Sequence, residues 1–283
     1  MIAFYGMGLL GSNFVRALRE RGETLHVWNR TASRAKALET DGVVAFDDPA
    51  EAARGAARVH VTLSDDSAVD DVLERAMGGF DDGLVIVDHT TTSPTGAAER
   101  VRRWGERGIG FQHAPVFMGP QNAREGTGLM LASGDRARFD ALEPELAKMT
   151  GKVVYLGPRP DRAAAFKLLG NLFLLAMTTG VIDMLSLAKG MGIGPSEAAA
   201  LFDWFNPGAS LPARAARVLQ ADFDHPSWEL AMARKDARLM MEAADRGDVA
   251  LSLIPAIARE MDRWIEQGHA HDDWTVIAAD ALG

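Results

Sequence analysis

The sequence predicts an α/β domain followed by an all-helical domain. Up to about Pro158, short apolar segments alternate with helical segments, which is typical of a largely parallel sheet with right-handed crossovers. From Arg162 onward the strand signals stop, and alanine, leucine, methionine and charged residues recur at helical spacing. Gly157-Pro158-Arg159-Pro160 ends regular structure, so we expect domains at 1–160 and 161–283.

The elements of the first domain follow from short apolar runs separated by helical spacing. The expected strands are Ile2–Tyr5, Leu25–Trp28, Arg58–Leu63, Leu84–Asp88, Gly110–His113 and Gly128–Ser133. The expected helices are Ser12–Arg21, Ser33–Thr40, Ser67–Ala76 and Pro94–Arg107.

One long helix should open the second domain, from about Arg162 to Lys189. It would span about 40 Å at about 1.5 Å per residue, which exceeds the needs of a small domain. Its apolar run Leu168–Leu187 is interrupted by polar residues and glycines, so we expect a buried interdomain helix and no membrane span. The stretch Phe166–Leu187 is too apolar for one small domain to cover, which predicts a homodimer or a higher homo-oligomer.

Composition narrows the classes of partner. The net charge of −9 argues against nucleic acid, because binding a polyanion requires a basic surface. The chain has no cysteine, which excludes disulfides, thiolate catalysis and zinc–thiolate sites. The first residues lack the pattern of a signal peptide, and we expect a cytoplasmic protein. The histidines are scattered apart from His269 and His271, so we expect no metal site.

A glycine-rich segment directly follows the first expected strand and opens a helix. It reads Gly6-Met7-Gly8-Leu9-Leu10-Gly11. Gly6 permits a tight turn, Gly8 lets a pyrophosphate approach the backbone, and Gly11 lets helix and strand pack closely. Since the context matches on both sides, the segment predicts a Rossmann-type dinucleotide site rather than the turn of an unrelated α/β fold.

The end of the second expected strand bears on the choice of cofactor. An NAD site usually carries an acidic residue here for the ribose hydroxyls, whereas this chain has Asn29 and Arg30. Arg30 would attract a 2′-phosphate, with Thr31 and Ser33 as further donors. We therefore expect NADP(H) to be preferred over NAD(H); the alternative is a solvated surface arginine.

A single lysine interrupts the apolar start of the long helix. Lys167 and Asn171 are four residues apart and share one helix face. Desolvation depresses the pKa of a semi-buried lysine, which suits it to acid/base catalysis near neutral pH. This segment alone favours the structural alternative, a snorkelling lysine beside a capping or core asparagine.

The motifs together resemble the β-hydroxyacid dehydrogenase family, which includes 3-hydroxyisobutyrate dehydrogenases and glyoxylate/succinic semialdehyde reductases. The resemblance covers nearly the whole chain. It rests on the glycine-rich loop and on the segments Asn29–Thr31, Val87–Pro94, His113–Val116, Gly126–Leu129, Lys167–Asn171 and Lys235–Asp236.

The resemblance implies roles for individual residues. Lys167 would exchange a proton with the substrate oxygen, and Asn171 would orient the substrate. Residues Phe117, Met118 and Gly119 would also border the substrate. The cofactor would be lined by Gly6, Met7, Gly8, Leu9, Leu10, Gly11, Asn29, Arg30, Thr31, Leu63, Ser64, Thr91 and Lys235.

Two departures concern the substrate. The family commonly has Ser-Gly-Gly after Ala-Pro-Val, where this chain has Phe117-Met118-Gly119, and Gly170 stands where many members have an asparagine. These changes favour a more apolar aldehyde, ketone or imine over a small hydroxy acid. The alternatives to a carbonyl reductase are an imine reductase on the same fold, where aspartate or tyrosine generally replaces the lysine, and a non-catalytic NADP(H)-binding protein.

Overall fold

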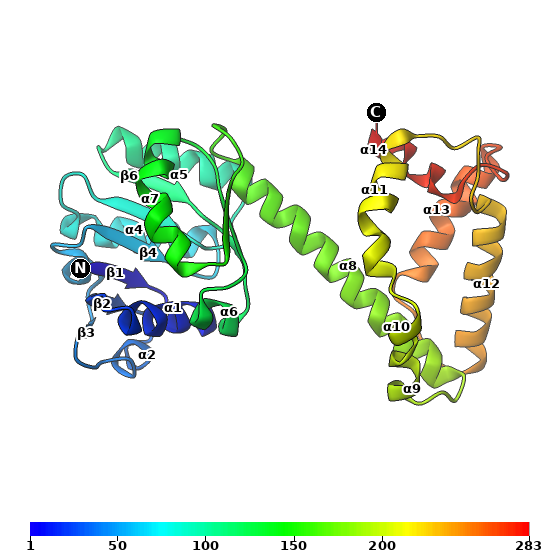
Figure 1. The fold of residues 1–283 in the computed structure, drawn as a ribbon, viewed down its shortest axis with the longest axis horizontal. Coiled ribbons are helices and arrows are strands. Elements are labelled where there is room, and N and C mark those ends of the chain that lie inside the picture. Colours follow the sequence, from blue (N-terminus) through cyan, green and yellow to red (C-terminus); the bar gives the residue numbers. More distant parts are fainter. Residues whose placement is uncertain (283) are drawn as a thin grey trace. The chain divides into compact units, whose positions relative to one another are not determined.

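The computed structural model describes residues 1–282, in two compact units divided as Met1–Asn171 and Leu172–Gly283. The division falls inside the long helix α8, Arg162–Gly190 (Figure 1). The first unit is α/β and the second is helical, as the sequence predicts.

A parallel six-stranded sheet organises the first unit, with strand order β3-β2-β1-β4-β5-β6. The order reverses between β1 and β4, and ligands of open α/β sheets bind beyond the carboxyl ends of the strands at such a reversal. The strands are β1 Ile2–Tyr5, β2 Leu25–Trp28, β3 Val43–Phe46, β4 Arg58–Val61, β5 Val85–Asp88 and β6 Gly110–His113. The helices are α1 Leu9–Glu20, α2 Ala32–Lys36, α3 Pro49–Ala53, α4 Asp66–Ala76 and α5 Pro94–Glu106, with a 3₁₀ turn at Met77–Gly79.

Each face of this sheet has its own core, because successive side chains of a strand point to opposite faces. Phe4 packs with Phe14 and Val27 on one face. Its neighbour Tyr5 packs with Val61 on the other. The two cores fix the register of β1, and with it the position of the glycine-rich loop that follows.

A second, three-stranded sheet was not expected from the sequence. It has the order β7-β8-β9, with β7 Val116–Phe117 antiparallel to β8 Leu129–Ala132, and β8 parallel to β9 Lys152–Tyr155. The chain reverses between β7 and β8 through α6 Pro120–Glu125, where Gly126 and Gly128 adopt positive φ. The expected strand Gly128–Ser133 therefore belongs to this sheet and not to the large one. Helix α7, Arg136–Leu146, and the 3₁₀ turn Ala147–Met149 connect β8 to β9.

Helices are the regular elements of the second unit in its described residues, joined by loops. Its helices after α8 are α9 Pro195–Ala199, α10 Leu201–Trp204, α11 Leu211–Gln220, α12 Leu230–Arg246, α13 Ile254–Glu266 and α14 Ala279–Leu282, with 3₁₀ turns at Pro207–Ser210 and Trp274–Ala278. Its core joins α12 and α13 through Leu230, Met261 and Trp264.

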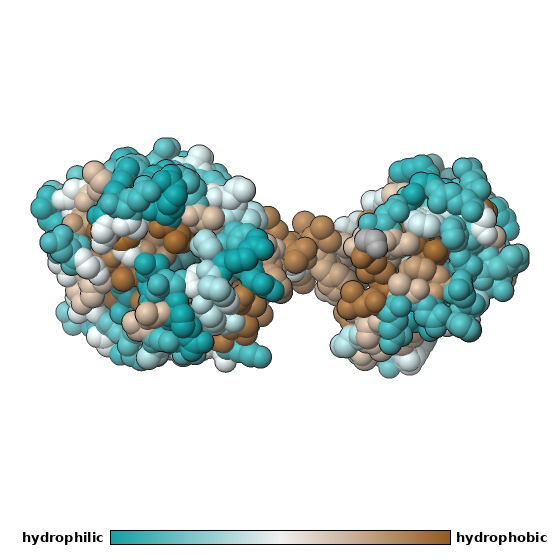
Figure 2. All heavy atoms as spheres, turned by 90° about the horizontal axis from the view of Figure 1, so that it is seen from above, coloured by the Kyte–Doolittle hydropathy of each residue, from teal (hydrophilic) through white to brown (hydrophobic). Residues whose placement is uncertain are grey.

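Helix α8 corrects one expectation, since it is not buried. Leu169, Leu172 and Leu175 are 61%, 67% and 70% exposed. Figure 2 shows hydrophobic side chains gathered along this helix. The reason is that apolar residues occupy every face of α8, so no single neighbouring surface covers them. Among residues 1–282 it is also the one helix whose length and composition would suffice to cross a membrane.

Candidate active site

The glycine-rich loop lies where the strand order reverses, between β1 and α1. Gly6 has φ +96°, and a Cβ there would overlap the carbonyl oxygen of Thr62. A Cβ at Gly11 would overlap the carbonyl oxygen of Gly6. At Gly8, by contrast, an added Cβ would meet no atom within 4 Å. Gly6 and Gly11 thus serve close packing, whereas Gly8 leaves its backbone open to a ligand.

The start of α1 offers donors to an anion. Gly8 is the N-cap residue of this helix and supplies no side-chain cap, so the first backbone N–H groups of the 12-residue helix lack a capping acceptor. The next residue, Leu9, is 78% exposed. An open backbone at Gly8 together with free helix N–H groups fits a diphosphate.

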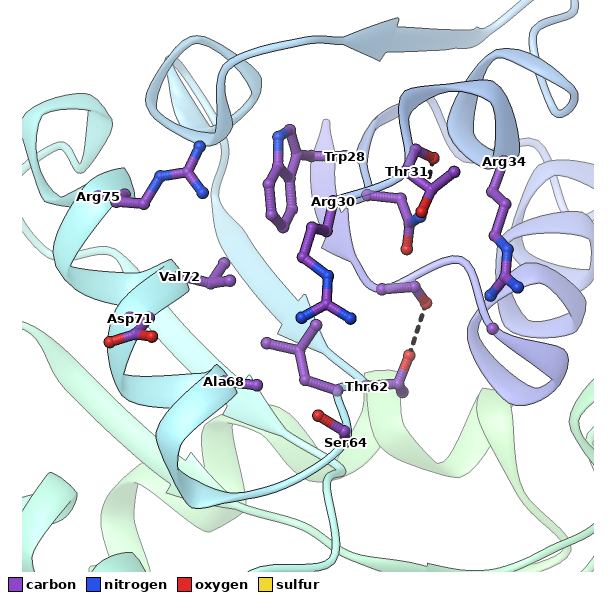
Figure 3. A pocket seen from close by; sticks show the side chains of 14 residues that line it. Trp28, Arg30, Thr31, Arg34, Thr62, Ser64, Ala68, Asp71, Val72 and Arg75 are labelled. Atoms are coloured by element: carbon purple, nitrogen blue, oxygen red, sulfur yellow. Dashed lines mark hydrogen bonds between the residues drawn. The ribbon is translucent and has the colours of Figure 1, made fainter.

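A cavity of about 390 Å³ lies beside this loop, beyond the ends of β2 and β4 (Figure 3). Arg30 points into it from the end of β2, and Arg34 borders it from α2. Arg75 of α4 stands over the ring of Trp28, 5.3 Å from the ring centroid. The full lining is Gly6, Gly8, Trp28, Asn29, Arg30, Thr31, Arg34, Thr62, Leu63, Ser64, Ala68, Asp71, Val72 and Arg75.

Sequence reasoning missed the contribution of α4 to this cavity. Ala68, Asp71, Val72 and Arg75 have the spacing of one helix face, which is the signal that could have identified them. Three arginines and one aspartate line the cavity, so it carries local positive charge within a chain of net charge −9.

Asn29 has a more specific place than expected. Its Oδ1 accepts a hydrogen bond from the Met7 amide at 2.9 Å, and its Nδ2 donates to the Thr31 carbonyl at 2.9 Å. The side chain therefore ties the end of β2 to the glycine-rich loop. Because both polar ends are used, Asn29 positions the loop while Arg30 is left to meet a ligand.

A smaller hollow of about 250 Å³ borders the other side of the loop. It shares Gly8, Thr62 and Leu63 with the larger cavity, so the two are neighbours around one segment. The Leu63 amide donates to Thr90 Oγ1 at 3.0 Å, which fixes the ends of β4 and β5 against each other. The hollow is lined by Gly8, Leu9, Leu10, Gly11, Thr62, Leu63, His89, Thr90 and Thr91.

A buried histidine chain lies under this hollow, and sequence reasoning did not predict it. His89 Nδ1 is 2.7 Å from the Ala114 carbonyl, and its Nε2 is 2.9 Å from His60 Nδ1. Arg58 Nε then donates to His60 Nε2 at 3.1 Å. These partners define one neutral tautomer for each ring, with Nδ1 protonated in both. Burial lowers the pKa of His60 well below its usual range, and it lowers the pKa of His89 to about 4.

Lys167 and Asn171 lie together at the start of α8, within the first unit. Lys167 is 9% exposed, and its Nζ donates to Asn171 Oδ1 at 2.9 Å. Nζ also stands over the ring of Phe117, 4.2 Å from its centroid. No carboxylate of residues 1–282 contributes to the pKa shift of Lys167. Desolvation lowers the pKa of Lys167 below that of an ordinary lysine.

The predicted substrate residues differ in position. Phe117 ends β7 and faces Lys167, whereas Met118 packs against Gly128 and Gly119 is exposed. Neither Lys167 nor Asn171 lines the two hollows around the glycine-rich loop. Lys235 lies in the second unit, where its Nζ pairs with Asp236 Oδ1 at 2.9 Å.

Comparison with known proteins agrees with this geometry. Residues 1–157 match the family described as the NAD binding domain of 6-phosphogluconate dehydrogenase. The uncharacterized oxidoreductase YfjR of Bacillus subtilis is 24% identical over 98% of each chain. The cytokine-like nuclear factor N-PAC of Mus musculus is 30% identical over 86% of this chain, which spans 44% of that protein's length.

Among solved structures, the chain is similar to an imine reductase from Myxococcus stipitatus in complex with NADP⁺. The TM-score is 0.92, with 19% identity over 99% of each chain. A variant of that enzyme was solved with NAD⁺. At this identity the likeness concerns the fold.

Proposed function

This chain belongs to the family that carries the NAD binding domain of 6-phosphogluconate dehydrogenase and includes the β-hydroxyacid dehydrogenases; from that premise we propose that it reduces a carbonyl group with NADPH and uses Lys167 as the proton donor. That it is an oxidoreductase with a nicotinamide cofactor follows from the family and from its relatives. The choice of NADPH, the carbonyl substrate and the role of Lys167 are the proposal.

The hydrogen bond between buried Lys167 and half-buried Asn171 is the observation that carries this proposal. A structural lysine would extend its ammonium to water, but Nζ of Lys167 is held inside by Asn171 Oδ1. Its lowered pKa makes the proton easier to release than that of an exposed lysine. Lys167 would donate this proton to the substrate oxygen as negative charge develops there, while Asn171 keeps Nζ in place.

The residues around the glycine-rich loop would hold the cofactor. The N–H groups of α1 and the open backbone at Gly8 suit the diphosphate, and Arg30 with Arg34 suits a 2′-phosphate. When bound, NADPH supplies the hydride, and the protein supplies position and charge. No carboxylate stands at the end of β2 to repel the phosphate.

Imine reduction is the second candidate, and the likeness in fold to imine reductases favours it. The same lysine could protonate a nitrogen in place of an oxygen. The two functions make opposite predictions about substrates, so a reaction panel separates them.

The test is a panel of small semialdehydes, keto acids, ketones and cyclic imines, with consumption of NADPH as the readout. The proposal expects turnover of carbonyl compounds in the absence of any amine. Turnover of cyclic imines alone would support the second candidate and contradict the proposal. Tight binding of NADPH with no turnover of any member would support a non-catalytic NADPH-binding protein.

A further inference from the structure

Phe117 and Gly170 form a matched pair beside Lys167. An added Cβ at Gly170 would lie 2.6 Å from Phe117 Cε1 and would overlap Cζ as well. The aromatic ring thus occupies the place of a side chain on α8, and a residue larger than glycine at position 170 would have to displace it. With α8 on one side and the Lys167 ammonium over its face, the ring is held as a fixed aromatic wall.

The side chains of Phe117 and Met118 offer no hydrogen-bond donor to a substrate carboxylate. Neither Phe117 nor Met118 has a side-chain donor, and the Gly119 amide already donates to Asn122 Oδ1 at 2.8 Å. The face of an aromatic ring carries partial negative charge, which attracts a cation and repels an anion. Lys167 is the cation that the ring faces, and as a proton donor it serves the reacting oxygen.

We infer that this site selects neutral carbonyl compounds, whose substituents are apolar and carry no carboxylate, and that Phe117 is the residue that determines this specificity. The inference rests on the proposed function, since it names the substrate class of the same site. An anion placed against the ring would exchange its hydration for an apolar face and receive no hydrogen bond from the side chains of Phe117 and Met118. An apolar chain would gain contact with the ring at no such cost.

The first experiment compares pentanal with succinic semialdehyde, which have similar length and differ in the terminal carboxylate. For the wild type we expect kcat/KM to favour pentanal at least about tenfold, since the carboxylate would be left without a partner. Phe117→Ser should reduce this ratio by about tenfold or more, mainly through a lower KM for the anion. The matched control, Phe117→Leu, stays apolar and should keep the preference for pentanal. A wild type that prefers succinic semialdehyde, or an unchanged ratio in Phe117→Ser, would overturn the inference.

The second experiment needs no turnover. Gly170→Ala should lower the melting temperature of the wild type, because the new methyl group meets the Phe117 ring. The same change in the Phe117→Ser background should cost clearly less, and this non-additivity measures the contact. Equal losses in both backgrounds would contradict the fixed wall.

The third experiment measures protection of the NADPH-loaded protein against thermal unfolding by pentanamide and by succinamate, its carboxylated counterpart. Stronger protection by pentanamide is expected, and stronger protection by succinamate would contradict the inference even if no substrate is reduced. Absence of all turnover together with protection by pentanamide would contradict the proposed function alone.

Discussion

The two units of this molecule differ in how completely they bury their large apolar side chains. In the first unit, two cores cover both faces of the sheet, and few large hydrophobic side chains are exposed before α8. In the second unit the core is small and rich in alanine, while large side chains such as Phe173, Leu175 and Trp204 are exposed. The first unit therefore completes its own core and carries the candidate site, whereas the second leaves large apolar side chains exposed.

We expect a second copy of this chain to cover these side chains. The test is a variant that disrupts the contact between the two copies. Leu172→Asp combined with Leu175→Asp places two carboxylates on the apolar surface of α8, and burying each would cost at least a few kcal/mol. Sedimentation should show a homodimer or larger oligomer for the wild type and a monomer for this variant. Lys189→Asp, on an exposed position of the same helix, is the control and should stay associated. A wild type that is monomeric and stays soluble would contradict the expectation.

Lowering the pH should affect the stability of the two units differently. His60 and His89 are buried and neutral in the first unit, with pKa values below that of an unfolded histidine. As pH falls from about 6.5 to about 4, the unfolded chain therefore binds protons that the folded chain does not bind. The free energy of unfolding decreases across that window. We expect a loss on the order of 1–3 kcal/mol from His89.

Urea unfolding at about pH 7 and about pH 5 measures this effect. His89→Gln should show a smaller loss on acidification than the wild type. In the second unit the exposed His225 is the matched control, because Asp222 raises its pKa and its protonation favours the fold. If His89→Gln and His225→Gln lose stability equally on acidification, the buried chain does not control the acid response.

An effect of comparable size tests the cavity of the first unit. Arg30→Ala should weaken NADPH binding by about 1.5–3 kcal/mol, the usual value of a charge-assisted hydrogen bond, and should leave NADH nearly unchanged. Isothermal titration with both cofactors measures it. Arg54→Ala, an exposed arginine outside the cavity lining, is the control. Equal or tighter binding of NADH by the wild type would contradict the expected preference.

The parts of the structure that the sequence predicted are those governed by local geometry. The glycine spacing at 6, 8 and 11 follows from one turn and one helix packing on one strand. Lys167 and Asn171 meet because a helix brings residues four apart together. The strands β1, β2 and β6 begin and end at the expected residues.

The parts that were missed depend on contacts between distant segments. His60 and His89 meet through the register of neighbouring strands, and nothing near either residue signals the other. Phe117 and Gly170 are 53 positions apart, and the small size of residue 170 is explained by its contact with the Phe117 ring. The short strands β7 and β9 of the second sheet likewise take their structure from pairing with β8.

The role of Lys167 is the central claim, and single-turnover reduction measured across pH tests it most directly. With protonated Lys167 as the proposed donor, the rate of reduction by the wild type should be steady at low pH. It should fall as pH rises through the pKa of Lys167, at a pH below the usual value for lysine. Lys167→Ala should be slower by about 10²–10⁴-fold and should lack this alkaline fall. Lys167→Arg should not restore the rate, because arginine keeps its proton. A Lys167→Ala variant that keeps more than about a tenth of the wild-type rate, with the same pH profile, would remove Lys167 from the mechanism.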